Sequence, residues 1–342
     1  MGEDGRVFLR GITSESYGLG EFRHRQLAAG RVRGDEVVVD DAAVAHSGDS
    51  AQSRTWWRVG PGDKDFLTQT LQVHFVELAP GGSNHGHGHQ NEALFYILEG
   101  RGYEIHDDKR YDWEKDDLVI VHDDSVHRHF NASDTERALC IIFKAKSMWM
   151  YLGLIQQGRS AEFSQAGYGP RRDWAQLWTP GVADRKKVVK PADTTWQETP
   201  DGRVRIMSSP ARTDVRAFSV DAYEQEIAPG AQSAAHWHMA DEVLYVLSGS
   251  GRSMQWQVEA EIAEKYYARV AEEPTRWEFT AGDTIYVPHN TVHQFVNTSS
   301  DEPLRLLSAQ NRAFKLLGYD RTVYLETKDE RVLDPIDTVS VL

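Results

Sequence analysis

A chain of 342 residues is long enough to bury two hydrophobic cores, and its length alone favours two domains. It carries 52 acidic against 38 basic residues, and the net charge of -14 argues against nucleic acid or anionic lipid as a partner. The N-terminus lacks a signal-like apolar stretch, and no apolar run is long enough to cross a bilayer. We therefore expect a cytoplasmic protein without membrane contact.

Residues 1–50 are polar and rich in glycine and alanine, with DEVVVDD at 35–41 as the one strand-like piece. Such a composition predicts an arm rather than a separate core. The arm is expected to lie on the other domain of the chain or on a neighbouring subunit.

A repeat sets the organisation of the rest of the chain. Sliding the sequence by 149 residues superposes Gly81 on Gly230, His87 on His236, His89 on His238 and Gly100 on Gly249. A shift of 166 superposes Asp117 on Asp283, Val121 on Val287, His127 on His293 and Asn131 on Asn297. The same unit therefore occurs twice.

Each copy consists of short segments rich in β-branched and aromatic residues, closed by glycine or turn formers, as in ALFYILEG and EVLYVLSG. This pattern predicts an all-β fold of two sandwiches or small barrels. We place the two domains at 51–150 and 201–330, with a turn-rich connecting segment at 151–200 and a C-terminal tail at 331–342. Cys140, the single cysteine, lies in the apolar run ALCIIF and is expected to be a buried strand residue.

The two shifts differ by 17 residues, so the second copy contains an insertion of that size, which we place within 256–279. Ile262, Tyr266 and Val270 recur there at helical spacing. The spacing predicts a helical insertion, either packed outside the barrel or closing over it as a lid.

The second copy contains a candidate metal centre. His236 and His238 are two residues apart, so on a strand they point to the same face, and Glu242 has the same parity. His293, on a later strand, would complete a cluster of three imidazoles and one carboxylate. This donor set suits a divalent first-row metal such as Fe, Mn, Ni, Cu or Zn.

In the first copy, His85, His87 and His89 share a face, so spacing alone does not choose between them. The repeat selects His87 and His89, with His127 as the third ligand. Ala93 stands where the second copy has Glu242, and Glu92 is expected to point to the opposite face. The first copy therefore predicts a neutral three-histidine site with open coordination positions.

The second copy, read as G-x5-H-x-H-x3-E-x6-G followed by G-x5-P-x4-H-x3-N, resembles the two cupin motifs. The resemblance spans roughly residues 55–320. It implies two cupin barrels in tandem, of the double-stranded β-helix or jelly-roll type, with a few peripheral helices.

The first copy, with HGHQNEALFYILEG followed by SVHRHFN, resembles the gentisate 1,2-dioxygenase group of bicupins, which includes salicylate and hydroxynaphthoate dioxygenases. The resemblance implies Fe(II) on His87, His89 and His127, and ring cleavage of a hydroxylated aromatic by O2. His129 would then be a base or a hydrogen-bond donor to substrate or oxygen. It also implies a homodimer or homotetramer.

One departure from that group concerns the substrate carboxylate. The group usually has an arginine where this chain has Phe95, so Arg54 or Arg58 would have to supply the positive charge. Phe95, Trp56 and Trp57 are the candidate aromatic residues around a substrate ring. A further departure is that the second copy retains a complete ligand set, which leaves room for a second divalent metal.

Two other function classes compete with the dioxygenase. One is oxalate decarboxylase or oxidase chemistry with manganese on His236, His238, Glu242 and His293. The other is a metal-dependent binding or sensor protein without turnover. Metal content, oxygen uptake and CO2 release distinguish the three.

Overall fold

The computed structural model describes residues 30–32, 53–60, 66–67, 70–123, 125–146, 149, 157–159, 170 and 184–325, and most of these lie in strands. The strand-like piece at 35–41, the C-terminal tail and most of the segment between 151 and 183 lie outside the described residues. Two short helices occur in the described part, η5 (Pro191–Asp193) and α5 (Ala313–Leu316). No helix in that part is long and apolar enough to span a membrane. The prediction of an all-β fold with few helices is confirmed.

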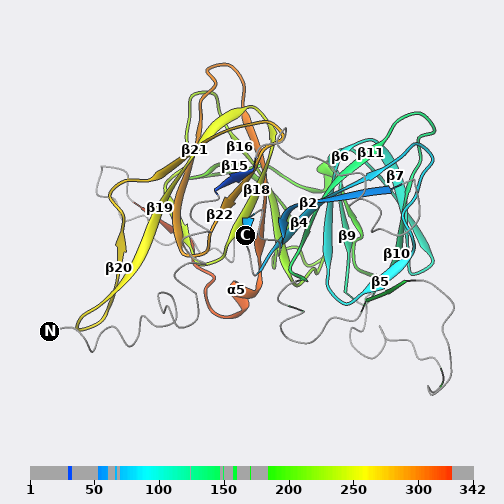
Figure 1. Cartoon of the computed structure of the whole chain (residues 1–342), viewed down its shortest axis with the longest axis horizontal. Coiled ribbons are helices and arrows are strands. Elements are labelled where there is room, and N and C mark those ends of the chain that lie inside the picture. Colours follow the sequence, from blue (N-terminus) through cyan, green and yellow to red (C-terminus); the bar gives the residue numbers. More distant parts are fainter. Residues whose placement is uncertain are drawn as a thin grey trace.

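Two facing sheets form the first barrel (Figure 1, blue to green). One sheet has the order β13-β9-β6-β11-β4-β2-β3, and the other has the order β12-β5-β10-β7-β8. The strands are β2 (Ser53–Gly60), β3 (Phe66–Leu67), β4 (Gln72–Leu78), β5 (His87–His89), β6 (Ala93–Glu99), β7 (Arg101–His106), β8 (Lys109–Glu114), β9 (Leu118–Val121), β10 (Ser125–Asn131), β11 (Ala138–Lys144), β12 (Gln157–Arg159) and β13 (Val188–Val189).

The second barrel repeats this plan (Figure 1, mainly yellow-green to orange-red, with β1 in dark blue). Its sheets have the orders β1-β22-β18-β24-β16-β15-β14 and β20-β19-β23-β17-β25, and β21 also pairs with β19. The strands are β1 (Arg31–Val32), β14 (Gln197–Thr199), β15 (Gly202–Ser208), β16 (Val220–Ile227), β17 (His236–His238), β18 (Glu242–Ser248), β19 (Ser250–Ile262), β20 (Tyr266–Val270), β21 (Thr275–Thr280), β22 (Thr284–Val287), β23 (Thr291–Asn297), β24 (Leu304–Asn311) and β25 (Val323–Tyr324).

The two seven-stranded sheets pack against each other through their outer faces. One hydrophobic cluster contains Phe75 and Tyr96 of the first barrel together with Val243 and Tyr286 of the second. Separate clusters fill the interior of each barrel. Because side chains alternate along a strand, Ala93 points into the first barrel whereas its neighbour on β6 points to the interface. Such strands are buried on both faces and read as continuous apolar runs.

The motif residues that flank the histidines have structural roles in both copies. Gly100 and Gly249 have φ angles of 84° and 88°, and a Cβ at either position would approach a backbone carbonyl to 2.6 and 2.9 Å. The side-chain amide of Asn131 donates to three backbone carbonyls, and Asn297 does the same in the second barrel. These residues therefore fix turns and do not take part in chemistry.

The expected helical insertion is wrong, because residues 256–279 form parts of the strands β19, β20 and β21 and the turns between them. β19 continues past its pairing with β23 and forms a hairpin with β20, which extends away from the barrel (Figure 1). Ile262, Tyr266 and Val270 are four residues apart, an even spacing that keeps them on one face of a strand as well as of a helix. Tyr266 is 68% exposed.

The N-terminal arm is described only at residues 30–32. Arg31 and Val32 form strand β1, which pairs with Ile285 and Thr284 of the second barrel. This short piece therefore lies on the far domain of the same chain, in line with one of the two expected placements.

A buried charge cluster crosses the interface and gives a stability prediction. Glu224 is fully buried, binds the Arg205 guanidinium, accepts from Arg305 at 2.6 Å and accepts the Tyr96 hydroxyl at 2.9 Å. Glu224→Ala would leave the Arg205 charge buried without a partner, so we expect a loss of about 3–5 kcal/mol in the free energy of unfolding. Urea denaturation measures this loss.

The matched control lies two residues away on β16. Glu226 forms an ion pair with Arg203 at 2.8 Å, but the Arg203 side chain is 45% exposed. Glu226→Ala should therefore cost about 1 kcal/mol or less. Equal losses in the two variants would contradict a special role for the Glu224 cluster.

Candidate metal centres and their surroundings

The first barrel brings three of the predicted ligands together. β5 and β10 pair antiparallel with His127 opposite His87, and His89 follows two residues along β5 on the same face. The ligand atoms of His87, His89 and His127 lie within 4.8 Å of one another. His89 and His127 are buried, and His87 is partly exposed. The structure therefore gathers the three imidazoles that the repeat selected.

The orientation of these imidazoles fits a metal ion. The Nδ1 atoms of His87, His89 and His127 lie 3.0, 2.6 and 3.4 Å from backbone carbonyl oxygens. A proton on Nδ1 leaves a lone pair on Nε2 as the ligand. Within the described part of the chain, Nε2 of His89 and Nε2 of His127 are buried without a hydrogen-bond partner. A metal ion would satisfy both atoms.

Burial keeps the imidazoles of His89 and His127 neutral. Burial lowers the pKa of His89 and of His127 well below the ordinary value, and the neighbouring cationic groups and histidines lower it further. Neutral imidazole is the form that binds a metal.

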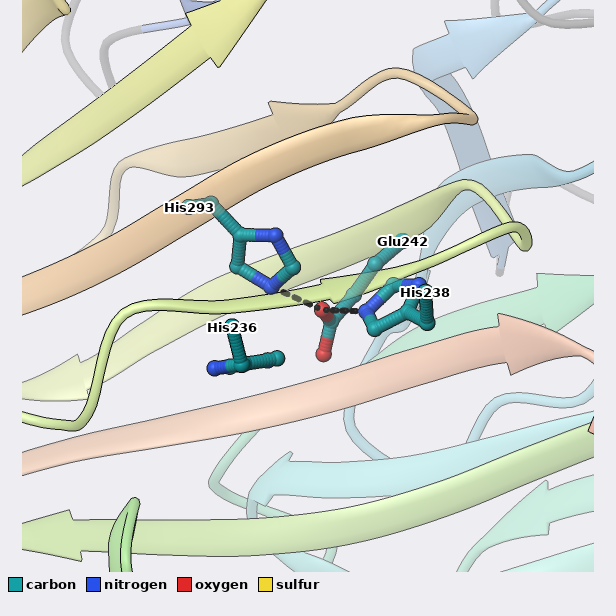
Figure 2. Close-up of side chains that lie close together, drawn as sticks. All are labelled: His236, His238, Glu242 and His293. Atoms are coloured by element: carbon teal, nitrogen blue, oxygen red, sulfur yellow. Dashed lines mark hydrogen bonds and ion pairs between the residues drawn. The ribbon is translucent and has the colours of Figure 1, made fainter. Parts of the chain in front are cut away.

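The second barrel holds the complete set of four (Figure 2). His236 pairs with His293 across β17 and β23, and His238 lies on the same face of β17. Oε2 of Glu242 is 3.2 Å from Nε2 of His238 and 3.3 Å from Nε2 of His293. The Nδ1 atom of each of the three histidines again lies 2.8–3.2 Å from a backbone carbonyl oxygen.

Further contacts hold the Glu242 carboxylate in place. Oε1 accepts the Tyr223 hydroxyl at 2.6 Å and also the Ser308 hydroxyl. Burial acts to raise the pKa of Glu242, but the contacts with His238 and His293 outweigh it and hold the pKa well below the ordinary value. The carboxylate is therefore an anion placed to bind a metal.

His129 lies beside the first centre, on the same face of β10 as His127. Its ring is 4.4 Å from the Phe95 ring, and its Nδ1 is 3.6 Å from Oε2 of Glu104. Burial lowers the pKa of His129 to about 3 and raises the pKa of Glu104 well above its usual range. His129 is thus a neutral imidazole with Phe95 on one side and a buried carboxyl group on the other.

The other aromatic and basic candidates from β2 lie elsewhere. Trp56 stacks on Phe75 with 5.4 Å between ring centroids, in the interface between the barrels. The Arg58 guanidinium lies 4.9 Å from the centre of the same Phe75 ring. Arg54 is exposed and lies 3.9 Å from Glu77.

The side chains of Arg54, Arg58 and Trp56 thus lie on the outer face of the sheet, and the structure does not bring them to the three-histidine centre. Trp57 pairs with His74 on β4, and its side chain lies outside what the structure describes. Glu92 also lies at the interface, where its Oε2 accepts hydrogen bonds from Phe218 and Ser219 of the second barrel.

The sequence interpretation missed polar residues on the inner face of the first barrel. Gln72 and His74 on β4 share that face with Leu78, and Lys144 on β11 shares it with Ile142. A signal was present, since Lys144 ends the apolar run ALCIIF and falls on Gln310 under the shift of 166. Glu104 was missed as well, on a strand that carries no motif.

Comparisons with known proteins agree with this architecture. The Cupin_2 family (Cupin domain) matches residues 74–143, and the Cupin_1 family (Cupin) matches residues 197–315. Two barrels, each with a metal-ligand cluster of the cupin type, define a bicupin.

Among curated proteins, the 1-hydroxy-2-naphthoate 1,2-dioxygenase of Nocardioides sp. (strain KP7) is 26% identical over 322 residues, which cover 82% of this chain and 75% of the relative. Among solved structures, a salicylate 1,2-dioxygenase variant from Pseudoaminobacter salicylatoxidans in complex with gentisate has a TM-score of 0.64 at 13% identity, covering 95% and 96% of the two chains. A mutant of Bacillus subtilis oxalate decarboxylase has a TM-score of 0.55 at 15% identity, covering 82% and 76%. The chain therefore carries two cupin domains in tandem, and over most of its length it is similar to bicupin dioxygenases.

Proposed function

We propose that this chain is a ring-cleaving dioxygenase that uses Fe(II) on His87, His89 and His127 to cleave a hydroxylated aromatic compound with O2. The main support for this proposal is the three-histidine centre, in which Ala93 stands at the position of the carboxylate ligand. Three neutral ligands leave the full charge of the metal and about three positions of an octahedron for substrate and oxygen. Similarity to a naphthoate dioxygenase over most of both chains supports the reaction class.

The residues around the centre suit this chemistry. Bound iron would supply Lewis acidity and the electron transfer that O2 requires. Neutral His129 has a buried Nε2 without a hydrogen-bond partner among the described residues, and that atom can accept a hydrogen bond from a phenolic hydroxyl. The Glu104 carboxyl group lies 3.6 Å from Nδ1 on the other side of the ring. Phe95 offers an apolar surface beside His129, against which an aromatic ring can pack.

For the second barrel we propose metal binding without ring cleavage. His236, His238, Glu242 and His293 would bind a second divalent metal, for which Fe, Mn, Ni, Cu and Zn are all compatible with the donors. Because Glu242 lowers the net charge of that centre, we assign ring cleavage to the first barrel. The cytoplasmic location and the dimeric or tetrameric state stay predictions.

Oxygen uptake tests the proposal. The protein is loaded anaerobically with Fe(II) and then screened with salicylate, gentisate, 1-hydroxy-2-naphthoate, hydroquinone and catechol. We expect oxygen consumption with at least one of them and a product whose mass is increased by that of O2. CO2 release from oxalate by the manganese-loaded protein would favour the decarboxylase alternative, and ligand binding without oxygen uptake would favour a sensor.

A further inference from the structure

The two barrels can be compared position by position around the missing carboxylate. In the second barrel, Glu242 on β18 pairs with Gln310 on β24. In the first, Leu94 pairs with Phe143, so Ala93 and Lys144 lie side by side one residue further along both strands. Lys144 therefore occupies the position of Gln310.

The correspondence between the two barrels continues on the neighbouring strands, β4 in the first barrel and β16 in the second. Gln310 pairs with Asp221 on β16, and Lys144 pairs with Gln72 on β4. Two residues further along, Tyr223 on β16 corresponds to His74 on β4. Both carry a group that can donate a hydrogen bond, and both point into their barrel.

In the second barrel this arrangement holds a carboxylate that belongs to the protein. Tyr223 donates to Oε1 of Glu242, and the Gln310 amide lies 3.3 Å from Nε2 of His238, a metal-ligand atom. The equivalents of Tyr223 and Gln310 therefore surround the point where a carboxylate meets the metal.

In the first barrel, Lys144 and His74 lie around the position that corresponds to the Glu242 carboxylate, and none of the described residues places a carboxylate there. Ala93 presents only a methyl group, and Lys144 and His74 replace the amide and the phenol. No carboxylate among the described residues forms an ion pair with Lys144. Lys144 lies close enough to His74, His89 and His129 to affect the protonation of all three.

Lys144 is only partly exposed, and a cation that is largely removed from water without an anion beside it favours a ligand that supplies one. Burial, with a smaller contribution from Lys146, lowers the pKa of Lys144 to about 7. Within the described residues, the protein thus places a basic group beside the metal ligands without a carboxylate paired to it.

We propose that Lys144 and His74 form the binding subsite for a carboxylate of the substrate, which takes the place that the Glu242 side chain has in the second barrel. This inference rests on the proposed function and names the residues of this chain that would bind a carboxylate next to the ring hydroxyl. Lys144 replaces in this role the arginine whose position is occupied by Phe95.

Equilibrium binding tests the subsite without turnover. The Fe(II)-loaded protein is titrated anaerobically by calorimetry with 1-hydroxy-2-naphthoate and with 1-naphthol, which lacks the carboxylate. Lys144→Met removes the charge at similar length. We expect it to weaken naphthoate binding about 10- to 100-fold, the range for a hydrogen bond to a charged group, and to change naphthol binding by less than about threefold.

Two further variants keep the test selective. Lys144→Arg retains the charge and should restore most of the naphthoate affinity. Lys109→Met removes an exposed lysine on β8 and should have no effect. Iron content per chain, measured for every variant, shows whether the centre is intact.

The outcomes separate this inference from the dioxygenase proposal. Binding of naphthoate that depends on Lys144, without oxygen uptake, supports the subsite and contradicts the dioxygenase. Oxygen uptake with naphthoate binding that is unchanged in Lys144→Met overturns the subsite and leaves the dioxygenase standing. Equal losses for naphthoate and naphthol, or no naphthoate binding by the unaltered protein, also overturn the subsite.

Discussion

His127→Ala should abolish oxygen uptake, with a loss of at least about 100-fold. Substitution of groups that merely orient a metal ligand costs 10–100-fold in affinity or activity, and loss of a ligand itself should cost more. His127 is one of three ligands and lies at the centre of β10, where its Nε2 has no hydrogen-bond partner among the described residues. With two imidazoles left, the first centre should lose its iron.

The repeat supplies the matched comparison. His293→Ala removes the equivalent ligand from the second barrel, and it should release only the metal bound there. Metal analysis of both variants, together with oxygen uptake on the best substrate, shows which barrel catalyses ring cleavage. If His127→Ala kept ring cleavage and His293→Ala abolished it, the assignment of the reaction to the first barrel would be wrong.

The metal centres could be predicted because they depend on local geometry. Two histidines two residues apart on a strand share a face whatever the rest of the fold does, and the second copy selects His87 and His89 from the three histidines of the first. The structure places His127 and His293 opposite their partners in the same register. The two-residue period of a strand and the spacing of the motif were therefore sufficient to predict the metal-binding histidines.

The lining of the site could not be predicted in the same way. β2 lies in a sheet that is buried on both faces, so neither face of SRTWWRVG is marked by polarity as the inner one. A register shift between Trp57 and Val59 changes the parity within the strand as well. Arg54, Arg58 and Trp56 therefore looked like site residues although they lie on the outer face.

Lys144 and His74 were not predicted as site residues for a different reason. Lys144 and His74 lie on strands without a metal motif, and only the pairing of β4 with β11 and of β11 with β6 brings them to Ala93. Long-range pairing of this kind is a property of the fold and is not encoded in any short segment. The hairpin of β19 and β20 was missed for a different reason, since a spacing of four fits both a helix and a strand.

Ala93→Glu should stop ring cleavage while the metal stays bound. The substitution gives the first barrel the donor set of the second, and Lys144 is placed to neutralise the new carboxylate. Metal affinity should therefore be retained or increased. The new side chain would occupy a coordination position and reduce the charge of the centre, so we expect oxygen uptake to fall at least about 100-fold, close to the effect of losing a ligand.

Ala93→Gln separates charge from volume, because it fills the same space without a negative charge. Metal content, anaerobic naphthoate binding and oxygen uptake are measured for Ala93→Glu, Ala93→Gln and the unaltered protein. If the protein's own carboxylate competes with that of the substrate, Ala93→Glu loses naphthoate binding more completely than Ala93→Gln. Full oxygen uptake by iron-loaded Ala93→Glu would show that the three-histidine donor set is not what makes this centre a dioxygenase.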